Sequence, residues 1–403
     1  MTRHRHPRLP HLLTALLTTL LTAGILTLPG LAAATDVGNF APVTPDRALS
    51  FPRDFGAHPD YRTEWWYITG WLTDAQGRER GFQVTFFRSA TGIGADNPSR
   101  FAPRQLLLAH AAIADPGSDH LRHAERAARV LPPLTGAEPT DTQVWIGDWT
   151  LRRTPNGGSS EDTYRTRIEA DDFAFDLTLT PAGPPVLNGQ AGFSQKSPNP
   201  QDASHYYSRP QLEVTGELRL VATGNGSEKG KGNSPAHRVT GRAWLDHEWS
   251  TAYLPEQAQG WDWIGINLHD GGSLMAYRMR RADDSTLWAG GTLLRPGQPK
   301  RVLGPDEICF TPRRHWQSPR TGTRYPVEWT LEIDDLRLRL RPLMDDQELD
   351  SRRSTQTIYW EGAVRVLKEG AAQDSAVETK PEPTEIGRGY LEMTGYWQRQ
   401  SSL

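Results

Sequence analysis

Residues able to do chemistry are concentrated in one stretch, residues 241–279 (GRAWLDHEWSTAYLPEQAQGWDWIGINLHDGGSLMAYRM). Four tryptophans are interleaved there with four titratable side chains: Trp244, Trp249, Trp261, Trp263, Asp246, His247, Glu248 and Asp262. Indole rings beside groups that give or take protons are typical of a pocket for a mostly apolar ligand. The stretch therefore predicts such a pocket, with Trp249, Trp261 and Trp263 among its ligand-binding residues.

A strand over residues 243–249 would divide the titratable groups between two faces. Side chains of a strand alternate, so His247 and Trp249 share one face and Asp246 and Glu248 the other. Two carboxylates two residues apart repel each other, which raises one pKa and keeps an acid protonated near neutral pH. Asp246 and Glu248 are thus candidate acids, or else solvated or paired with arginine. His247 is a candidate catalytic residue, or else a core histidine bonded to a backbone carbonyl.

A second aromatic cluster, residues 64–67 (EWWY), lies near the other end of the chain. On a strand, Glu64 and Trp66 share a face, and we expect both to contact the ligand; the alternative is an ordinary domain core with an ion-paired residue. His110 stands among apolar strand residues and is a further candidate ligand-binding residue.

Several common catalytic signatures are missing. The closest match to a Gly-x-Ser-x-Gly elbow is residues 192–196 (GFSQK), which lacks the last glycine. No His-Glu-x-x-His motif occurs, and Asp246, His247 and Glu248 alternate faces, so they are poorly placed to bind one metal. The segment from His120 to His123 fits a polar surface better than a metal site. We therefore expect no metal and no cofactor, and disfavour serine hydrolases, zinc proteases and nucleotide enzymes.

The first residues predict export. Three arginines within residues 1–8 precede an apolar run over residues 12–28 and the small residues Ala32, Ala33 and Ala34. This is the pattern of a cleavable signal peptide over residues 1–34; the alternative is a membrane anchor. We expect a periplasmic or secreted protein without a stable membrane anchor after cleavage.

Charge and cysteine content limit the partners and the covalent cross-links that the protein can have. The formal net charge is −3 and no long basic run occurs, so we expect no nucleic-acid partner. Cys309 is the only cysteine, which excludes an intramolecular disulfide. Stability must come from packed apolar side chains, to which 14 tryptophans contribute.

Most ordered-looking segments alternate with period two between turn residues, which predicts an all-β protein of antiparallel strands. The predicted strands are residues 64–72, 81–88, 106–114, 143–152, 164–170, 173–180, 212–220, 238–249, 260–268, 273–281, 286–294, 327–333, 336–343, 358–367 and 388–397. The best helix candidate is residues 120–130. Residues 224–236, rich in Gly, Ser and Lys, predict a linker between β domains at 50–223 and 237–400, each a barrel or sandwich by strand count.

Several motifs together resemble, in order, the carotenoid 1,2-hydratase (hydroxyneurosporene synthase)-like, AttH-like secreted family. The matching segments span about residues 55–397: 58–59 (HP), 64–70 (EWWYITG), 81–88 (GFQVTFFR), His110 with Asp115, 192–196 (GFSQK), 205–208 (HYYS), Gly216, 241–249 (GRAWLDHEW), 260–263 (GWDW) and 389–396 (GYLEMTGY). The resemblance implies two lipocalin-like antiparallel β-barrel or sandwich domains packed together, with a ligand cavity near the shared blocks. It also implies export, and members are often linked to ABC-type export systems and labelled secreted hydrolases.

In the hydratase branch, water adds across the terminal double bond of an acyclic carotenoid. His247, Trp249 and Tyr277 match residues of that branch, which adds Tyr277 to the candidate catalytic residues. An aspartate follows two places after the tyrosine in that branch; here Met279 stands there. The candidate proton donor of the branch is therefore missing from this position.

Three functions follow from these observations. The first is an exported carrier that binds an apolar, isoprenoid or lipid-like molecule, as an accessory to an ABC-type export system. The alternative is a hydro-lyase in which Asp246 or Glu248 gives the proton, His247 orients water and aromatic faces stabilise the cation. His247 faces away from both acids, and this separation counts against the hydro-lyase mechanism. The third is a secreted hydrolase, for which no nucleophile or metal is evident.

Overall fold

In the computed structural model, the described residues are 40–94, 96–99, 101–156, 158–221, 234–252, 254–333, 335–369 and 383–397. The predicted signal peptide, residues 1–34, lies outside them, as does most of the predicted linker. None of the helices formed by the described residues has the length and apolarity that crossing a membrane requires.

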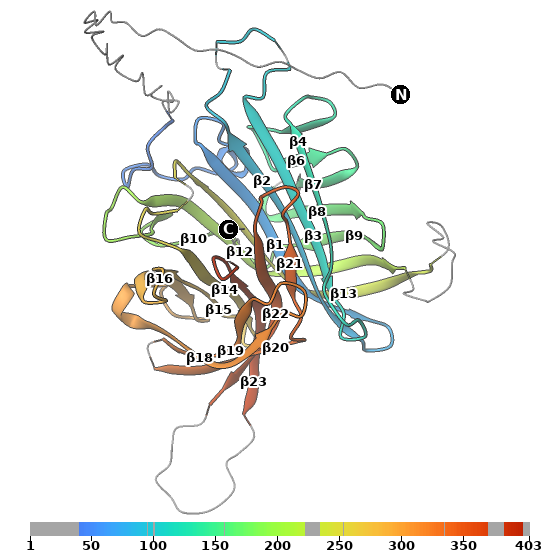
Figure 1. Cartoon of the computed structure of the whole chain (residues 1–403), viewed down its shortest axis with the longest axis vertical. Helices are drawn as coiled ribbons and strands as arrows, with labels where there is room; N and C mark the ends of the chain where they lie inside the picture. Colours follow the sequence, from blue (N-terminus) through green and yellow to red (C-terminus); the bar gives the residue numbers. More distant parts are fainter. Residues whose placement is uncertain are drawn as a thin grey trace, which may run out of the picture. The chain divides into compact units, whose positions relative to one another are not determined.

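The first sheet has 13 antiparallel strands in the order β4-β3-β2-β1-β13-β12-β9-β8-β7-β6-β5, with β10 and β11 also paired to β12 (Figure 1). Their bounds are β1 Thr63–Asp74, β2 Glu79–Ala90, β3 Gln105–Ala114, β4 Arg122–Arg129, β5 Thr135–Ala137, β6 Gln143–Ile146, β7 Trp149–Asn156, β8 Gly158–Glu169, β9 Phe173–Thr180, β10 Val186–Leu187, β11 Phe193–Gln195, β12 Ala203–Leu220 and β13 Ala236–Ser250. The sheet is nearly closed: Arg126 of β4 donates to the Ile146 carbonyl of β6 at 3.0 Å.

The second sheet has 10 antiparallel strands in the order β17-β16-β15-β14-β23-β22-β20-β19-β18, with β21 paired to β22. Their bounds are β14 Gly260–Leu268, β15 Ser273–Arg280, β16 Thr286–Leu294, β17 Arg301–Leu303, β18 Ile308–Gln317, β19 Arg324–Ile333, β20 Leu336–Pro342, β21 Glu348–Asp350, β22 Ile358–Lys368 and β23 Thr384–Met393. Two short 3-10 helices complete the described elements, η1 Arg53–Phe55 and η2 Pro305–Glu307.

The all-β prediction is confirmed, and the helix predicted at residues 120–130 is wrong. Residues Arg122–Arg129 form β4, which pairs with β3 so that Glu125 lies opposite His110. Ala124 and Ala128 of β4 pack against the first core. Pairing with the edge of β3 outweighs the intrinsic helix propensity of this alanine- and arginine-rich segment, because tertiary context overrides propensity.

The chain crosses from the first sheet to the second later in the sequence than predicted. β13 follows the predicted linker at 224–236, yet it pairs with β1 and β12 in the middle of the first sheet (Figure 1). The second sheet begins only with β14, after Ser250. The predicted boundary therefore does not separate the two sheets, because composition marks a polar connection without showing which strands it joins.

Buried apolar side chains form two interiors and a layer between them. One core lies within the first sheet and includes Trp66 and Trp249; another lies within the second and includes Trp329 and Trp360. The third cluster joins the sheets: Tyr67, Trp71, Tyr206, Trp244, Trp263, Met275, Tyr277, Met279, Leu287, Ala363 and Tyr390. Strands beside this layer are therefore buried on both faces.

The sheets approach closely where this layer is tight. The Trp71 indole donates to the Gly389 carbonyl at 3.1 Å, and Asn267 donates to the Ala243 carbonyl at 3.0 Å. A Cβ on Gly81 would lie 2.5 Å from the Tyr390 hydroxyl and 2.7 Å from the Ala363 Cβ. Glycine at residue 81 thus allows β2 to contact the second sheet.

We predict that Gly81→Val lowers the free energy of unfolding by about 1–3 kcal/mol, because the added side chain must displace Tyr390 and Ala363. Valine suits a strand, so the loss would report packing between the sheets. Urea denaturation measures it. Gly183→Val is the matched control, since a Cβ on Gly183 meets nothing within 4 Å; equal losses in both variants would contradict the close-contact explanation.

Candidate functional site

The two faces of β1 and β13 lead to different interiors. These strands pair so that Trp66 lies opposite His247 and Tyr67 opposite Asp246. Trp66 belongs to the core of the first sheet, and Tyr67 belongs to the layer between the sheets. The predicted separation of His247 from Asp246 and Glu248 is therefore confirmed.

A cavity of about 500 Å³ lies between the sheets. Aromatic and aliphatic side chains make most of its walls: Trp65, Tyr67, Phe87, Leu106, Leu108, Leu254, Trp261, Trp263, Tyr277, Met279 and Tyr359. Six predicted site residues line it: His110, Asp246, Glu248, Trp261, Trp263 and Tyr277. Met279, which stands where the hydratase branch has an aspartate, lines it too.

The cavity has a mouth and an inner end. Its lining includes the exposed residues Ala252 and Thr355, which mark the mouth. From there the lining residues of β1 run from Thr63 inward to Tyr67, beyond which the layer is packed. A second hollow of about 730 Å³ has more polar walls and contains none of the predicted site residues.

Asp246 lies in the wall at the inner end and is fully engaged. Tyr206 and Ser208 donate to its two oxygens at 2.5 Å each, and the Trp244 indole donates at 2.6 Å. Burial raises the pKa of Asp246 to about 7, although these hydrogen bonds oppose the rise, and Glu248 adds to it. The predicted pKa elevation is present, but burial rather than carboxylate repulsion is its largest cause.

Glu248 is paired with a largely buried lysine. Lys196 Nζ lies 2.8 Å from Glu248 Oε1 and 4.2 Å from the centre of the Tyr277 ring. Burial disfavours the ammonium, yet the neighbouring Glu248 raises the pKa of Lys196. Lys196 also donates to Ser194 Oγ at 3.1 Å. A protonated lysine cannot take the Ser194 proton, so this pair does not provide an activated nucleophile.

Two glutamates that face each other at the cavity were not predicted. Glu361 of β22 and Glu392 of β23 lie directly opposite each other across the strand pair, and both line the cavity. Glu361 is 2 % exposed and has no hydrogen-bond partner of normal geometry; Glu392 is partly exposed. Burial raises the pKa of Glu361 well above its usual value, and Glu392 raises it further. Burial also raises the pKa of Glu392 to about 8.

A signal for one of these acids was present in the sequence. Glu361 is the lone carboxylate within the otherwise apolar start of a predicted strand, residues 358–364 (IYWEGAV). Glu392 stands in the closing motif, where nothing distinguishes it from a surface residue. That the two face each other depends on the pairing of β22 with β23, which local periodicity does not show.

His110 connects the two sheets beside the cavity. Its Nδ1 lies 2.7 Å from the Tyr359 hydroxyl of β22, and its Nε2 lies 2.8 Å from Ser354 Oγ. Burial lowers the pKa of His110 to about 3, and the charge of His123 contributes. His110 is therefore a neutral imidazole with a hydrogen-bond partner on each nitrogen.

The structure does not bring the other four predicted residues to the cavity. Glu64, Trp66, His247 and Trp249 lie on the opposite side of the sheet, inside the first core. Glu64 accepts from Arg88 Nε and lies 2.8 Å from His247 Nε2. The remaining His247 nitrogen, Nδ1, lies 3.0 Å from the Tyr207 hydroxyl. Strand periodicity groups these residues correctly but does not reveal which of two buried faces borders a cavity.

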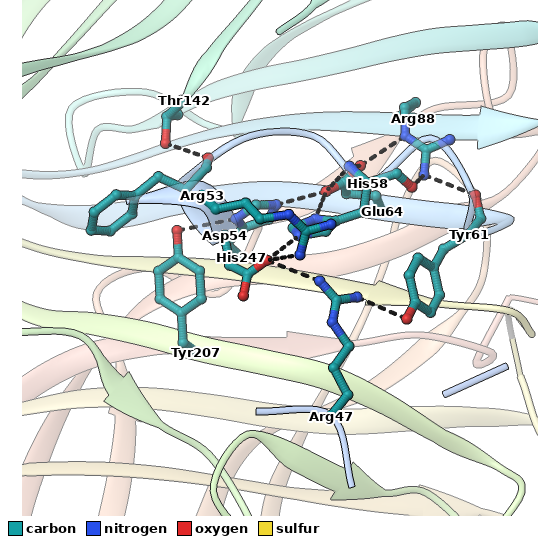
Figure 2. Close-up of polar contacts among 11 residues, drawn as sticks. Arg47, Arg53, Asp54, His58, Tyr61, Glu64, Arg88, Thr142, Tyr207 and His247 are labelled. Atoms are coloured by element: carbon teal, nitrogen blue, oxygen red, sulfur yellow. Dashed lines mark hydrogen bonds and ion pairs between the residues drawn. The ribbon is translucent and has the colours of Figure 1, made fainter. Parts of the chain in front are cut away.

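This buried network joins the segment before β1 to the sheet. His58 donates its backbone N–H to Glu64 at 2.9 Å and places its ring 3.1 Å from Asp54 (Figure 2). Burial disfavours the Glu64 carboxylate, but Arg88 and the two histidines hold the pKa of Glu64 well below its usual value. Burial lowers the pKa of His247 to about 4 despite Glu64. These features describe a structural charge network.

Within the described residues, His58, Glu64 and His247 form the one group whose ligand atoms could hold a metal, all within 4.8 Å of one another. The three atoms already bond to each other, since His58 Nδ1 and His247 Nε2 both contact Glu64 Oε1, at 2.7 and 2.8 Å. An ion would have to replace these bonds and would add charge beside Arg88. The group therefore fits a hydrogen-bonded network better than a metal centre.

Comparisons with known proteins agree with the fold. The family model described as AttH-like matches residues 42–396. A crystal structure of an AttH from Nitrosomonas europaea is 43% identical, with a TM-score of 0.77 over 89% of this chain and 100% of that one. Kievitone hydratase from Nectria haematococca is 16% identical, with a TM-score of 0.60 over 88% and 97%. The structure of CghA with Sch210972 is 13% identical, with a TM-score of 0.51 over 88% and 96%. No curated protein sequence matches the chain.

We predict that Glu64→Gln lowers the free energy of unfolding at neutral pH by about 3–5 kcal/mol, because Arg88 would remain buried without its counter-charge. A carboxylate whose pKa is depressed by folding stabilises above its unfolded pKa, and that stability is lost as the pH falls. The wild type should therefore lose stability from about pH 5 downward, and Glu64→Gln should lose less over the same range. Urea denaturation at several pH values measures both effects.

Glu332→Gln is the control for that comparison. Glu332 and its partner Arg337 are about half exposed, so losing their ion pair should cost about 1 kcal/mol or less. An unchanged acid dependence in Glu64→Gln would show that the network does not contribute as described.

Proposed function

The chain belongs to the AttH-like family, and from this premise we propose that it binds an apolar, isoprenoid or lipid-like small molecule in the cavity between its two sheets. The observation that carries the proposal is the cavity of about 500 Å³, with mostly aromatic and aliphatic walls and few polar groups. Small-molecule sites have this size and character, at roughly 300–1,000 Å³. Transfer of an apolar molecule from water to these walls is the driving force.

The polar groups of the cavity give the bound molecule a direction. The Lys196–Glu248 pair lies toward the mouth, where Ser204 donates to Glu248. Glu361 lies at the inner end with Tyr67 and Trp263, whose rings pack edge-on at 5.2 Å. We propose that a polar end of the ligand lies near Lys196 and that its apolar end reaches the acids. Export and an ABC-type partner stay predictions, consistent with a carrier.

A second function, addition of water to an isoprenoid double bond, is favoured by one observation. Glu361 is a buried acid without a regular hydrogen-bond partner at the wall of an apolar cavity. Its raised pKa keeps the proton available at neutral pH. A kievitone hydratase shares the fold, so this architecture accommodates a hydratase.

Water would add in two steps, protonation of the alkene and capture of the resulting cation. Glu361 gives its proton to one alkene carbon, whose new C–H bond uses the π electrons and leaves a cation on the other carbon. The faces of Tyr67 and Trp263 stabilise that cation. Water forms the C–O bond and gives its extra proton to Asp246, whose pKa near 7 leaves part of it ionised. His247, on the other side of the sheet, takes no part.

We predict that the wild type binds farnesol and that Leu108→Trp weakens this binding by about tenfold or more, which is about 1.4 kcal/mol, because the indole fills part of the cavity. Quenching of tryptophan fluorescence measures the affinity. Val302→Trp is the matched control, because Val302 is 44% exposed and does not line the cavity. Equal affinity in the two variants would place the ligand elsewhere.

For the second function, we predict that Glu361→Gln lowers turnover of a supplied acyclic carotenoid by about 100-fold or more, with little change in its binding. The amide keeps the shape of the side chain and cannot give the proton. Turnover by the wild type should rise through about pH 7 as Asp246 ionises, and Asp246→Asn should remove that rise. Product analysis by chromatography measures both. Full turnover by Glu361→Gln would exclude it as the acid.

A further inference from the structure

We infer that Glu125, Ser354, His110 and Tyr359 form a proton relay that connects the protein surface with Glu361. The inference rests on the second proposed function, since a Glu361 that gives a proton to a bound molecule must be reprotonated at each turnover. It assigns a role to His110, which the steps above do not use.

The outer half of the relay consists of direct hydrogen bonds. Glu125 of β4 is partly exposed and accepts from both the backbone N–H and the hydroxyl of Ser354, the former at 2.9 Å. Ser354 Oγ lies 2.8 Å from His110 Nε2. Glu125 and His110 are directly opposite on β4 and β3, so the sheet itself fixes the spacing between them.

The inner half crosses from the first sheet to the second. His110 Nδ1 lies 2.7 Å from the Tyr359 hydroxyl. Tyr359 and Glu361 are two residues apart on β22, and therefore share the face that lines the cavity. The Tyr359 hydroxyl is close enough to lower the pKa of Glu361, as is that of Tyr67. Neither makes a hydrogen bond of normal geometry with it. A hydrogen bond from the Tyr359 hydroxyl to Glu361 would complete the chain.

Each middle member of the chain both donates and accepts, so it keeps its number of protons while one proton passes along the chain. With Glu125 ionised, Ser354 donates to Glu125, His110 Nε2–H donates to Ser354, and Tyr359 donates to His110 Nδ1. Before a transfer to the ionised Glu361, the two hydroxyls turn and His110 changes from the Nε2–H to the Nδ1–H tautomer, which reverses every hydrogen bond of the chain. A protonated Glu125 gives a proton to Ser354, Ser354 to His110 Nε2, His110 Nδ1–H to Tyr359, and Tyr359 to Glu361. One proton enters at Glu125 and one arrives at Glu361.

The position of Glu361 explains why such a path is useful. Glu361 lies at the inner end of the cavity, whereas the exposed residues Ala252 and Thr355 lie at its mouth. An apolar ligand that fills the space between them would exclude water from Glu361. The relay reaches Glu361 through the side of the cavity, from β3 and the loop before β22, and so avoids the bound molecule.

The test follows hydrogen–deuterium exchange at Glu361 in protein saturated with farnesol, which keeps water out of the cavity. Exchange is started by rapid dilution into D2O and followed by time-resolved infrared spectroscopy. The carbonyl band of the protonated carboxyl is assigned by its absence in Glu361→Gln. We expect Tyr359→Phe to slow the isotope shift of this band by about tenfold or more, since it keeps the ring and removes the hydroxyl. Ser354→Ala, on the loop, should slow it as well.

Tyr67→Phe is the matched control, because Tyr67 also lies beside Glu361 but has no bond to His110. Fast exchange in Tyr67→Phe with slow exchange in Tyr359→Phe would support the relay. Equal rates in the wild type, Tyr359→Phe and Ser354→Ala would overturn it. Because the readout needs no substrate, a protein without hydratase activity that shows the slowed exchange would refute the second function and leave the relay in place.

Discussion

Burial of both faces of β1 and β13 is the constraint on which the rest of this structure depends. Each of these strands has one face in the core of the first sheet and the other in the layer between the sheets. Over residues 243–250 of β13 and the β1 residues that pair with them, both faces are largely shielded from bulk water, so each polar side chain must find a partner or lose its charge. The two interiors meet this requirement in opposite ways.

Two glutamates on neighbouring sheets show the contrast. Glu64 in the first core is surrounded by Arg88 and two histidines, and its pKa falls well below the usual value. Glu361 in the cavity wall has another acid, Glu392, as its nearest strand neighbour, and its pKa rises. A paired charge fixes the chain in place, whereas an unpaired acid beside open apolar space retains a proton for a ligand. The residue types are alike, and their neighbours decide between stability and chemistry.

The sequence predicted the fold class, most strands and the separation of faces on β13, because these depend on local alternation. It did not predict that β13 joins the first sheet or that Glu361 meets Glu392, because strand order and cross-strand pairing are long-range properties. Six predicted residues reach the cavity and four do not. The sequence does not distinguish Trp66 and Trp249 from Trp261 and Trp263, since a packed core and a cavity wall both favour buried indoles. Which rings border empty space is decided by how the sheets pack.

The pairing of β1 with β13, unbroken from Thr63 to Asp74, has a consequence for how this protein tolerates change. Inserting or deleting a single residue in the middle of β13 would exchange the two interiors beyond that point. His247 would then face the cavity, and Asp246 or Glu248 would enter the core next to Glu64, placing two anions together without water. We therefore expect the length of this strand to vary less than its individual side chains, with insertions accommodated in the connections at its ends.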